Sequence, residues 1–311
     1  MSLKETLTEA GFSENEAERL ANDNWFAPRN SNKSAEEIKE KIKTIANTYL
    51  TTEAVIRKAV FSFPRFAGHD HQRVLQGIKD AYNCTEEDAS KAVLSHPPFA
   101  GYDHQRALQG IRDAYNCTEE EASKAVLSHP PFAGLNHQRV LQGIKDAYNC
   151  TEEKASKSIL SHPPFADYNH QRVLQGIKDA YNCTAEEASK AVLSHPPFAN
   201  LDHQRVLRQL SRIGRIAGLN KNEVIERILE NPVLAGYSAK RYLAAIDIGR
   251  ELRKDGISDN VRITCIWFSY PSKSPYVPDT KRLRIAQAAK RGINGEPTLM
   301  TVMRKRLRAA G

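Results

Sequence analysis

The chain repeats itself every 33 residues over much of its length. Four consecutive repeats agree at 24 of their 33 positions, and they begin at Gly68, Gly101, Gly134 and Asp167. Fainter copies extend upstream, in TYLTTEAVIRKAVFSFPRFAG, and downstream, in AGLNKNEVIERILENPVLAGYS. A repeat of this length is one supersecondary unit that buries its apolar face by stacking against its neighbours. The period therefore predicts a solenoid.

Each repeat carries signals for two short helices joined by a proline-rich bend. Thr85 and Asp88 predict a capping box, and hence a first helix that begins at Glu86. The sequence His96-Pro97-Pro98 ends this helix, because proline has no amide donor and disfavours helix in the residue before it. We call this element helix A.

The second helix, helix B, begins after Asp70, which predicts its N-cap, and ends at Asn83. Its apolar face contains Val74, Leu75, Ile78, Ala81 and Tyr82. Gly77 lies inside this helix, where glycine costs about 1 kcal/mol relative to alanine. We therefore expect a neighbouring helix to cross close to Gly77.

The charge is distributed unevenly along the chain. From His203 to the end there are 22 Lys and Arg against 9 Asp and Glu, a net charge of +13, and the first 202 residues carry −5. We predict a degenerate N-terminal cap over residues 1–33, tandem repeats over 34–202, and divergent repeats with a basic C-terminal cap over 203–311. A one-sided positive field indicates a polyanionic partner, nucleic acid rather than a membrane.

The sequences CTEEEASKAVLSHPPFAGLNHQRVLQGI and NKNEVIERILENPVLAGYSAKRYLAAI resemble the repeat of the mitochondrial transcription termination factors. In that repeat a helix, a proline and an apolar pair lead into a second helix. The resemblance covers most of the chain and implies an all-α, superhelical solenoid of helix–loop–helix repeats. It also implies that double-stranded nucleic acid is held against a concave, basic surface.

Nearly identical repeats with a few changing letters also resemble TAL effectors and similar proteins, in which a two-residue loop reads one base per repeat. In the order and spacing of its helices, with a Pro-Pro bend and a longer loop, the repeat is more similar to that of the termination factors. We expect a nucleic-acid-binding protein, with double-stranded DNA favoured over RNA. A protein-interaction solenoid is the alternative.

Three positions between the constant FA and HQR sequences vary from repeat to repeat, and we call them the variable triplet. They are candidates for reading a base or a partner. The alternative is structural, because Asp and Asn are preferred N-caps and a large residue before an N-cap commonly forms a hydrophobic staple. The candidates are His69, Asp70, Tyr102, Asp103, Leu135, Asn136, Tyr168, Asn169, Leu201 and Asp202.

Arginine provides the candidate phosphate contacts. In HQRVLRQLSRIGR, four arginines follow one helix face with no acid between them, as expected of a face that phosphates neutralise. One arginine also recurs in the first turn of every helix B, near backbone amides that favour anions, and it is a candidate for binding phosphate. The alternative is that this arginine forms an ion pair with a glutamate of the next repeat. The candidates are Arg73, Arg106, Arg139, Arg172, Arg205, Arg208, Arg212, Arg215, Lys281, Arg282 and Arg284.

No sequence signal indicates catalysis. The chain has no glycine-rich phosphate loop and no carboxylate cluster outside the capping boxes. It also has no Ser/His/Asp arrangement in a structural context typical of a catalytic triad. We expect a monomer that is not an enzyme and uses no cofactor, metal or small-molecule substrate. One cysteine per repeat, at Cys84, Cys117, Cys150 and Cys183, predicts small buried thiols rather than disulfides or zinc ligands.

The start of the chain, MSLKETLTEAGF, has no apolar stretch long enough for a signal peptide or a membrane span. It contains Glu5 and Glu9, whereas transit peptides contain few acidic residues. We therefore expect a soluble intracellular protein, located in the cytoplasm, nucleoid or nucleus.

Overall fold

The structure, a computed structural model, describes residues 1–216 and 219–237. Within these ranges it is an all-α helical repeat without strands, which confirms the predicted fold class. The chain divides into two compact units, a first body (Met1–Tyr168) and a second body (Asn169–Gly311). None of the described helices is long and apolar enough to cross a membrane.

The first body contains three small helices followed by repeats in which helix A, a 3-10 helix and helix B alternate. Its elements are α1 (Leu3–Glu9), α2 (Glu14–Ala21), α3 (Phe26–Asn30), α4 (Ala35–Thr48), α5 (Glu53–Ser62), η1 (Pro64–Gly68), α6 (His71–Tyr82), α7 (Glu86–Ser95), η2 (Pro97–Gly101), α8 (His104–Tyr115), α9 (Glu119–Ser128), η3 (Pro130–Gly134), α10 (His137–Tyr148), α11 (Glu152–Ser161) and η4 (Pro163–Asp167).

The second body continues the same order of elements. Its described elements are α12 (His170–Tyr181), α13 (Ala185–Ser194), η5 (Pro196–Asn200), α14 (His203–Ile216), α15 (Lys221–Glu230) and η6 (Pro232–Gly236).

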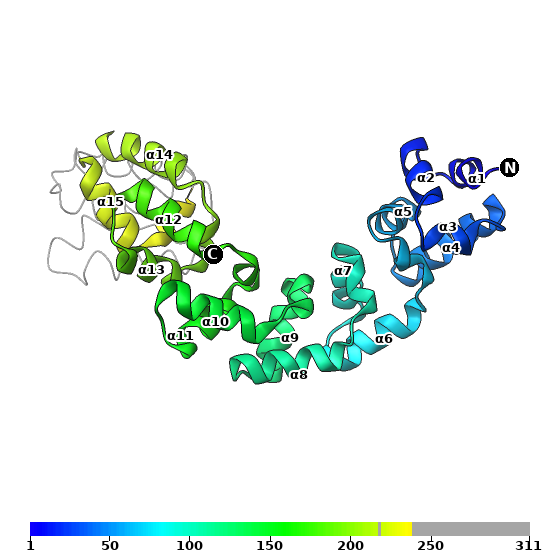
Figure 1. Ribbon diagram of the computed structural model, residues 1–311, viewed down its shortest axis with the longest axis horizontal. Helices are drawn as coiled ribbons and strands as arrows, with labels where there is room; N and C mark the ends of the chain where they lie inside the picture. Colours follow the sequence, from blue (N-terminus) through cyan, green and yellow to red (C-terminus); the bar gives the residue numbers. More distant parts are fainter. Residues whose placement is uncertain (217–218, 238–311) are drawn as a thin grey trace, which may run out of the picture. The chain divides into compact units, whose positions relative to one another are not determined.

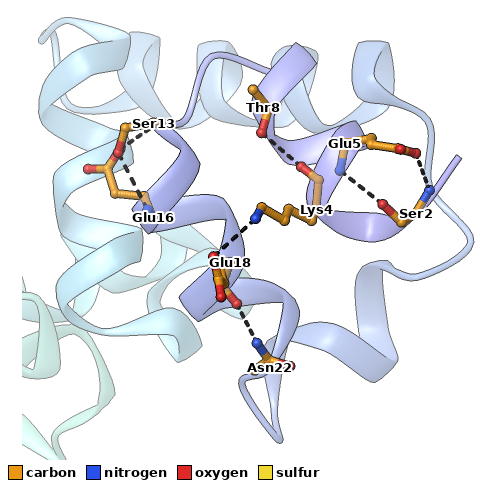
Figure 2. Close-up of polar contacts among 8 residues, drawn as sticks. All are labelled: Ser2, Lys4, Glu5, Thr8, Ser13, Glu16, Glu18 and Asn22. Atoms are coloured by element: carbon orange, nitrogen blue, oxygen red, sulfur yellow. Dashed lines mark hydrogen bonds and ion pairs between the residues drawn. The ribbon is translucent and has the colours of Figure 1, made fainter.

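Capping boxes begin the first two helices. The Glu5 amide donates to Oγ of Ser2 at 3.3 Å, and the Ser2 amide donates to the Glu5 carboxylate at 2.7 Å. Ser13 and Glu16 repeat the arrangement in α2 (Figure 2). An ion pair of 3.0 Å between Lys4 of α1 and Glu18 of α2 joins the two helices.

Helix A has the predicted ends. The Asp88 amide donates to the Thr85 hydroxyl at 3.1 Å, and α7 stops before Pro97. The full capping box forms where the third helical residue is the longer glutamate, as in the pair Thr118 and Glu121. The proline-rich bend between the two helices is a 3-10 turn in every described repeat.

Helix B also ends where the sequence predicts. Asn83 follows α6 with φ 47° and ψ 50°, the left-handed conformation that asparagine tolerates better than most residues. The other three copies end at an asparagine with φ between 46° and 50°. Leu50 occupies this place after α4 with φ 50°, and it is 87% exposed.

The repeats of the first body stack in two layers. Helices α5, α7, α9 and α11 each contact the next in one layer, and α4, α6, α8 and α10 do so in the other. In Figure 1, α7 and α9 lie on the same side of α6 and α8. Each helix therefore packs both against the neighbouring helix in the chain and against its counterpart in the next repeat, as in a solenoid.

The constant FA and HQR sequences supply the core between repeats. Phe99 is fully buried, and its ring centre lies 6.0 Å from that of Tyr82 and 4.6 Å from that of His104. The Tyr82 hydroxyl is 3.3 Å from Nδ1 of His104, one repeat further on. Equivalent pairs are Tyr49–His71 at 3.0 Å, Tyr115–His137 at 3.1 Å and Tyr181–His203 at 3.4 Å. The constant FA and HQR sequences on either side of the triplet therefore serve the packing of one repeat against the next.

The expectation for Gly77 is wrong. This residue and its counterparts Gly110, Gly143 and Gly176 are exposed, and a Cβ placed on any of them would have no neighbour within 4 Å. The close approach occurs instead at Gly214 in α14, where a Cβ would collide with Val224 of α15. Helical phase explains the difference, because Gly214 takes the buried position that Tyr82 occupies in α6.

The repeated cysteines are half-buried, rather than buried as predicted. Desolvation nonetheless raises the pKa of each thiol, at Cys84, Cys117, Cys150 and Cys183. A raised pKa lowers the thiolate fraction and hence the reactivity of a cysteine.

Candidate nucleic-acid interface

The predicted arginine column lies at the third residue of each helix B, on exposed side chains. The five backbone amides donate to the side chains that cap the helices, and no ion pair involves their guanidinium groups in the described parts of the chain. The residues are Arg73, Arg106, Arg139, Arg172 and Arg205.

The alternative, in which these arginines pair with glutamates of the next repeat, is wrong in the described structure. The first acid of helix A pairs instead with the last turn of the preceding helix B. These pairs are Lys79–Glu86 at 3.3 Å, Arg112–Glu119 at 3.2 Å and Lys145–Glu152 at 3.0 Å. In these three repeats helix B has an ion pair at its C-terminal end, and its N-terminal arginine forms none.

Position 3 of a helix is an unfavourable place for a cation, because the helix dipole is positive there. The column therefore costs stability and gains no internal ion pair. The capping residue tunes the local charge: Asp70 places a carboxylate beside Arg73, whereas Asn136 leaves Arg139 next to a neutral amide.

Helix α14 in the second body is more basic than the earlier B helices. In α6 the exposed face carries a Gln76–Asp80 hydrogen bond of 2.7 Å, and α14 has Arg208 and Arg212 at the same two positions. Nε of Arg208 donates to the backbone oxygen of Gln204 at 3.3 Å. Leu207, Leu210 and Ile213 are buried, so the arginines follow the opposite, solvent-facing side; they are Arg205, Arg208, Arg212 and Arg215.

A groove of about 620 Å³ lies beside the column in the first body, between α8 and the η3–α10 segment. Arg106 and Gly110 line one side of it, and Leu135, Asn136 and Gln138 line the other. Ala107 also lines it, at a position where the other repeats have valine. The groove presents Arg106 together with polar groups of the next repeat.

The third triplet position has a structural role in every described repeat. Oδ1 of Asp70, Asp103, Asn136, Asn169 and Asp202 accepts a hydrogen bond of 3.0–3.1 Å from the amide of the column arginine. These bonds confirm the capping interpretation. Base reading by the same side chains stays a prediction.

The second triplet position is half-buried in all five repeats, at His69, Tyr102, Leu135, Tyr168 and Leu201. The Tyr102 hydroxyl is 3.2 Å from Nε2 of His96, and its ring lies edge-on to Phe99, with the centres 5.8 Å apart. Tyr102 therefore makes contacts inside its own bend, and the hydrophobic staple stays a prediction.

The remaining candidates, Lys281, Arg282 and Arg284, lie outside the described residues. Within the described ranges, no three His, Cys, Asp or Glu side chains gather closely enough to hold a metal ion. Neither protein-family models nor curated proteins compared with the chain give a match.

Proposed function

We propose that this protein binds nucleic acid, with double-stranded DNA as the preferred ligand, through arginines on its B helices. The observation that carries the proposal is the column: one exposed, unpaired arginine per repeat, at a helix position where a cation is unfavourable. A periodic polyanion fits a periodic array of cations. The unopposed arginines of α14 add a stronger basic face.

Two further features support the proposal. The helix B amides and arginines favour anions at the same end of the helix. At the other end, Lys79 and its counterparts pair with the first acid of helix A. The sequence resemblance to the mitochondrial termination factors favours double-stranded nucleic acid. Phosphate contacts position a protein on a duplex without reading its sequence, so we assign the arginines to the backbone.

The experiment is a titration of a labelled duplex of random sequence, followed by fluorescence anisotropy at several salt concentrations between about 50 and 200 mM. A variant with Gln at Arg73, Arg106, Arg139 and Arg172 should bind more weakly, and its log–log salt slope should fall by about one per lost phosphate contact. Replacing Arg208, Arg212 and Arg215 by Gln should weaken binding to all sequences.

The repeats offer a matched control on helix A. Lys91, Lys124, Lys157 and Lys190 are exposed at one equivalent position, and replacing them by Gln removes the same charge from the same four repeats. This control should retain the salt slope of the parent. Equal losses of affinity in both variants would show that the column arginines act only through the net charge. Tighter binding of an RNA duplex of equal length would favour RNA, and no binding of either would favour a protein partner.

A further inference from the structure

We propose, on the basis of the nucleic-acid binding proposed above, that a glycine inside helix B marks where a bound strand comes closest to the protein. At this point the sugar–phosphate backbone packs directly against the helix, beside the column arginine. The glycine recurs in helix B of the four nearly identical repeats, α6, α8, α10 and α12, as Gly77, Gly110, Gly143 and Gly176.

The described fold does not require glycine at this position. Each of the four is the seventh of twelve residues in its helix, away from both caps. None has a left-handed φ, all are exposed, and an added Cβ would meet no atom within 4 Å. Because glycine in a helix interior is destabilising relative to alanine, each repeat gives up stability where its own packing would accept a side chain.

The glycine and the column arginine share one exposed face of helix B. Gly110 follows Arg106 by four residues, and residues at this spacing are neighbours on a helix surface. Both line the groove of about 620 Å³ between α8 and the η3–α10 segment. The missing side chain therefore leaves space free beside a cation, and glycine commonly occurs where a backbone and a ligand approach closely.

The other B helices lack this combination. In α4, Glu40 and Thr44 take the places of the column arginine and the glycine, so this helix has neither the cation nor the gap. In α14, Arg205 is followed four residues later by Gln209, and additional arginines extend the basic face. We therefore assign the close approach to the four repeats alone, and contacts through long side chains to α14.

The charges on the shared face favour an anion at its N-terminal half. The helix dipole and Arg106 attract phosphate there, although the capping carboxylate of Asp103 offsets part of this charge. Asp113, one turn beyond the glycine, carries a carboxylate that accepts a hydrogen bond of 2.6 Å from Nε2 of Gln109. A strand that crosses the helix between Arg106 and Gly110 therefore meets positive charge and a bare helix surface, and it avoids Asp113.

A methyl group at the glycine position would hold the strand away from the helix. Van der Waals contacts and hydrogen bonds weaken steeply with distance, whereas the attraction between charges falls more slowly. Alanine should therefore weaken binding while the electrostatic contribution of the column arginines remains.

Thermal unfolding and duplex titration of the same variants distinguish this contact from a structural role. A variant with Ala at Gly77, Gly110, Gly143 and Gly176 should unfold at a higher temperature than the parent, because alanine favours helix. It should nevertheless bind the random-sequence duplex several-fold more weakly at every salt concentration. Its log–log salt slope should match that of the parent, because no charge is removed. Leucine at the same four positions also favours helix and should weaken binding further.

The control is Gln209→Leu, which places the same apolar side chain at the equivalent position of α14, where no gap exists. This variant should bind as tightly as the parent. Unchanged affinity of the four-alanine variant, with weaker binding when the column arginines become Gln, would overturn the close approach and leave the proposed function intact. A lower unfolding midpoint would also overturn it, because the fold would then require the glycines. A parent protein that binds neither DNA nor RNA would overturn both proposals.

Discussion

The hydroxyl of Tyr115, at the end of α8, lies 3.1 Å from Nδ1 of His137, at the start of α10. Both side chains are more than nine-tenths buried, and Phe132 packs against both rings. This hydrogen bond joins consecutive repeats through residues 22 positions apart. It is a polar contact in a core made mainly of apolar side chains.

Removing this hydroxyl should destabilise the protein. Nε2 of His137 already has no hydrogen-bond partner, so Tyr115→Phe would leave both ring nitrogens buried and unpartnered. We expect the free energy of unfolding to fall by about 1–3 kcal/mol, measured by urea denaturation. Tyr102→Phe is the matched control: its hydroxyl is half-buried, so water can replace it and the loss should be smaller. A loss for Tyr115→Phe no larger than for the control would contradict this account.

The stability should fall as the pH drops from about 6.5 to about 4. Burial lowers the pKa of His71, His104, His137, His170 and His203 from 6.5 to about 4. In this window the unfolded chain binds protons that the folded chain does not, so each histidine should remove roughly 1.4 kcal/mol per pH unit.

Urea denaturation at pH 7.5, 6.0 and 5.0 measures this effect. The capping glutamates act in a separate window, because hydrogen bonds from Thr118 and Thr184 lower the pKa of Glu121 and Glu187 below 4.5, and their contribution is lost only in stronger acid. A constant free energy of unfolding from pH 7.5 to pH 5.0 would show that the histidines are not held neutral.

Replacing Leu50 by asparagine should stabilise the protein by about 1 kcal/mol, because φ 50° disfavours leucine and asparagine adopts it readily. Leu50 is 87% exposed, so little packing is lost. The reverse substitution, Asn116→Leu, should destabilise by a similar amount, since Asn116 has φ 48°. Thermal unfolding of both variants measures the effect; shifts in the same direction would contradict the backbone explanation.

Replacing Gly110 by alanine should raise the free energy of unfolding by roughly 0.5–1 kcal/mol, because alanine favours helix and the added Cβ meets nothing. Gly77, Gly143 and Gly176 should behave alike. Gly214→Ala is the contrasting variant and should destabilise, because its Cβ would collide with Val224. Urea denaturation of the single variants checks both signs, and a destabilising Gly110→Ala would reveal packing absent from this structure.

Local signals in the sequence were sufficient to place the helices. Thr85, Asp70 and Pro97 act through the backbone groups next to them, so their effect does not depend on the rest of the fold. The 3-10 turn in the bend was missed, because Pro-Pro determines where helix A stops but leaves the conformation of the next residues open.

Contacts between repeats could not be predicted in the same way. The partner of Glu86 is Lys79 rather than a column arginine, which depends on the angle between successive helices. Gly77 illustrates the same limit, because the sequence does not show that the side of helix B that carries this glycine faces solvent. Asp167 takes the place that glycine has in the three preceding repeats, and the sequence alone does not indicate its ion pair with His129.

The Tyr–His bonds span only 22 residues each, so every such junction closes over a short length of chain. Closing a short loop costs little entropy, and topologies dominated by local contacts fold quickly. We therefore expect the stack to assemble progressively during synthesis, each repeat docking soon after it leaves the ribosome onto those already formed.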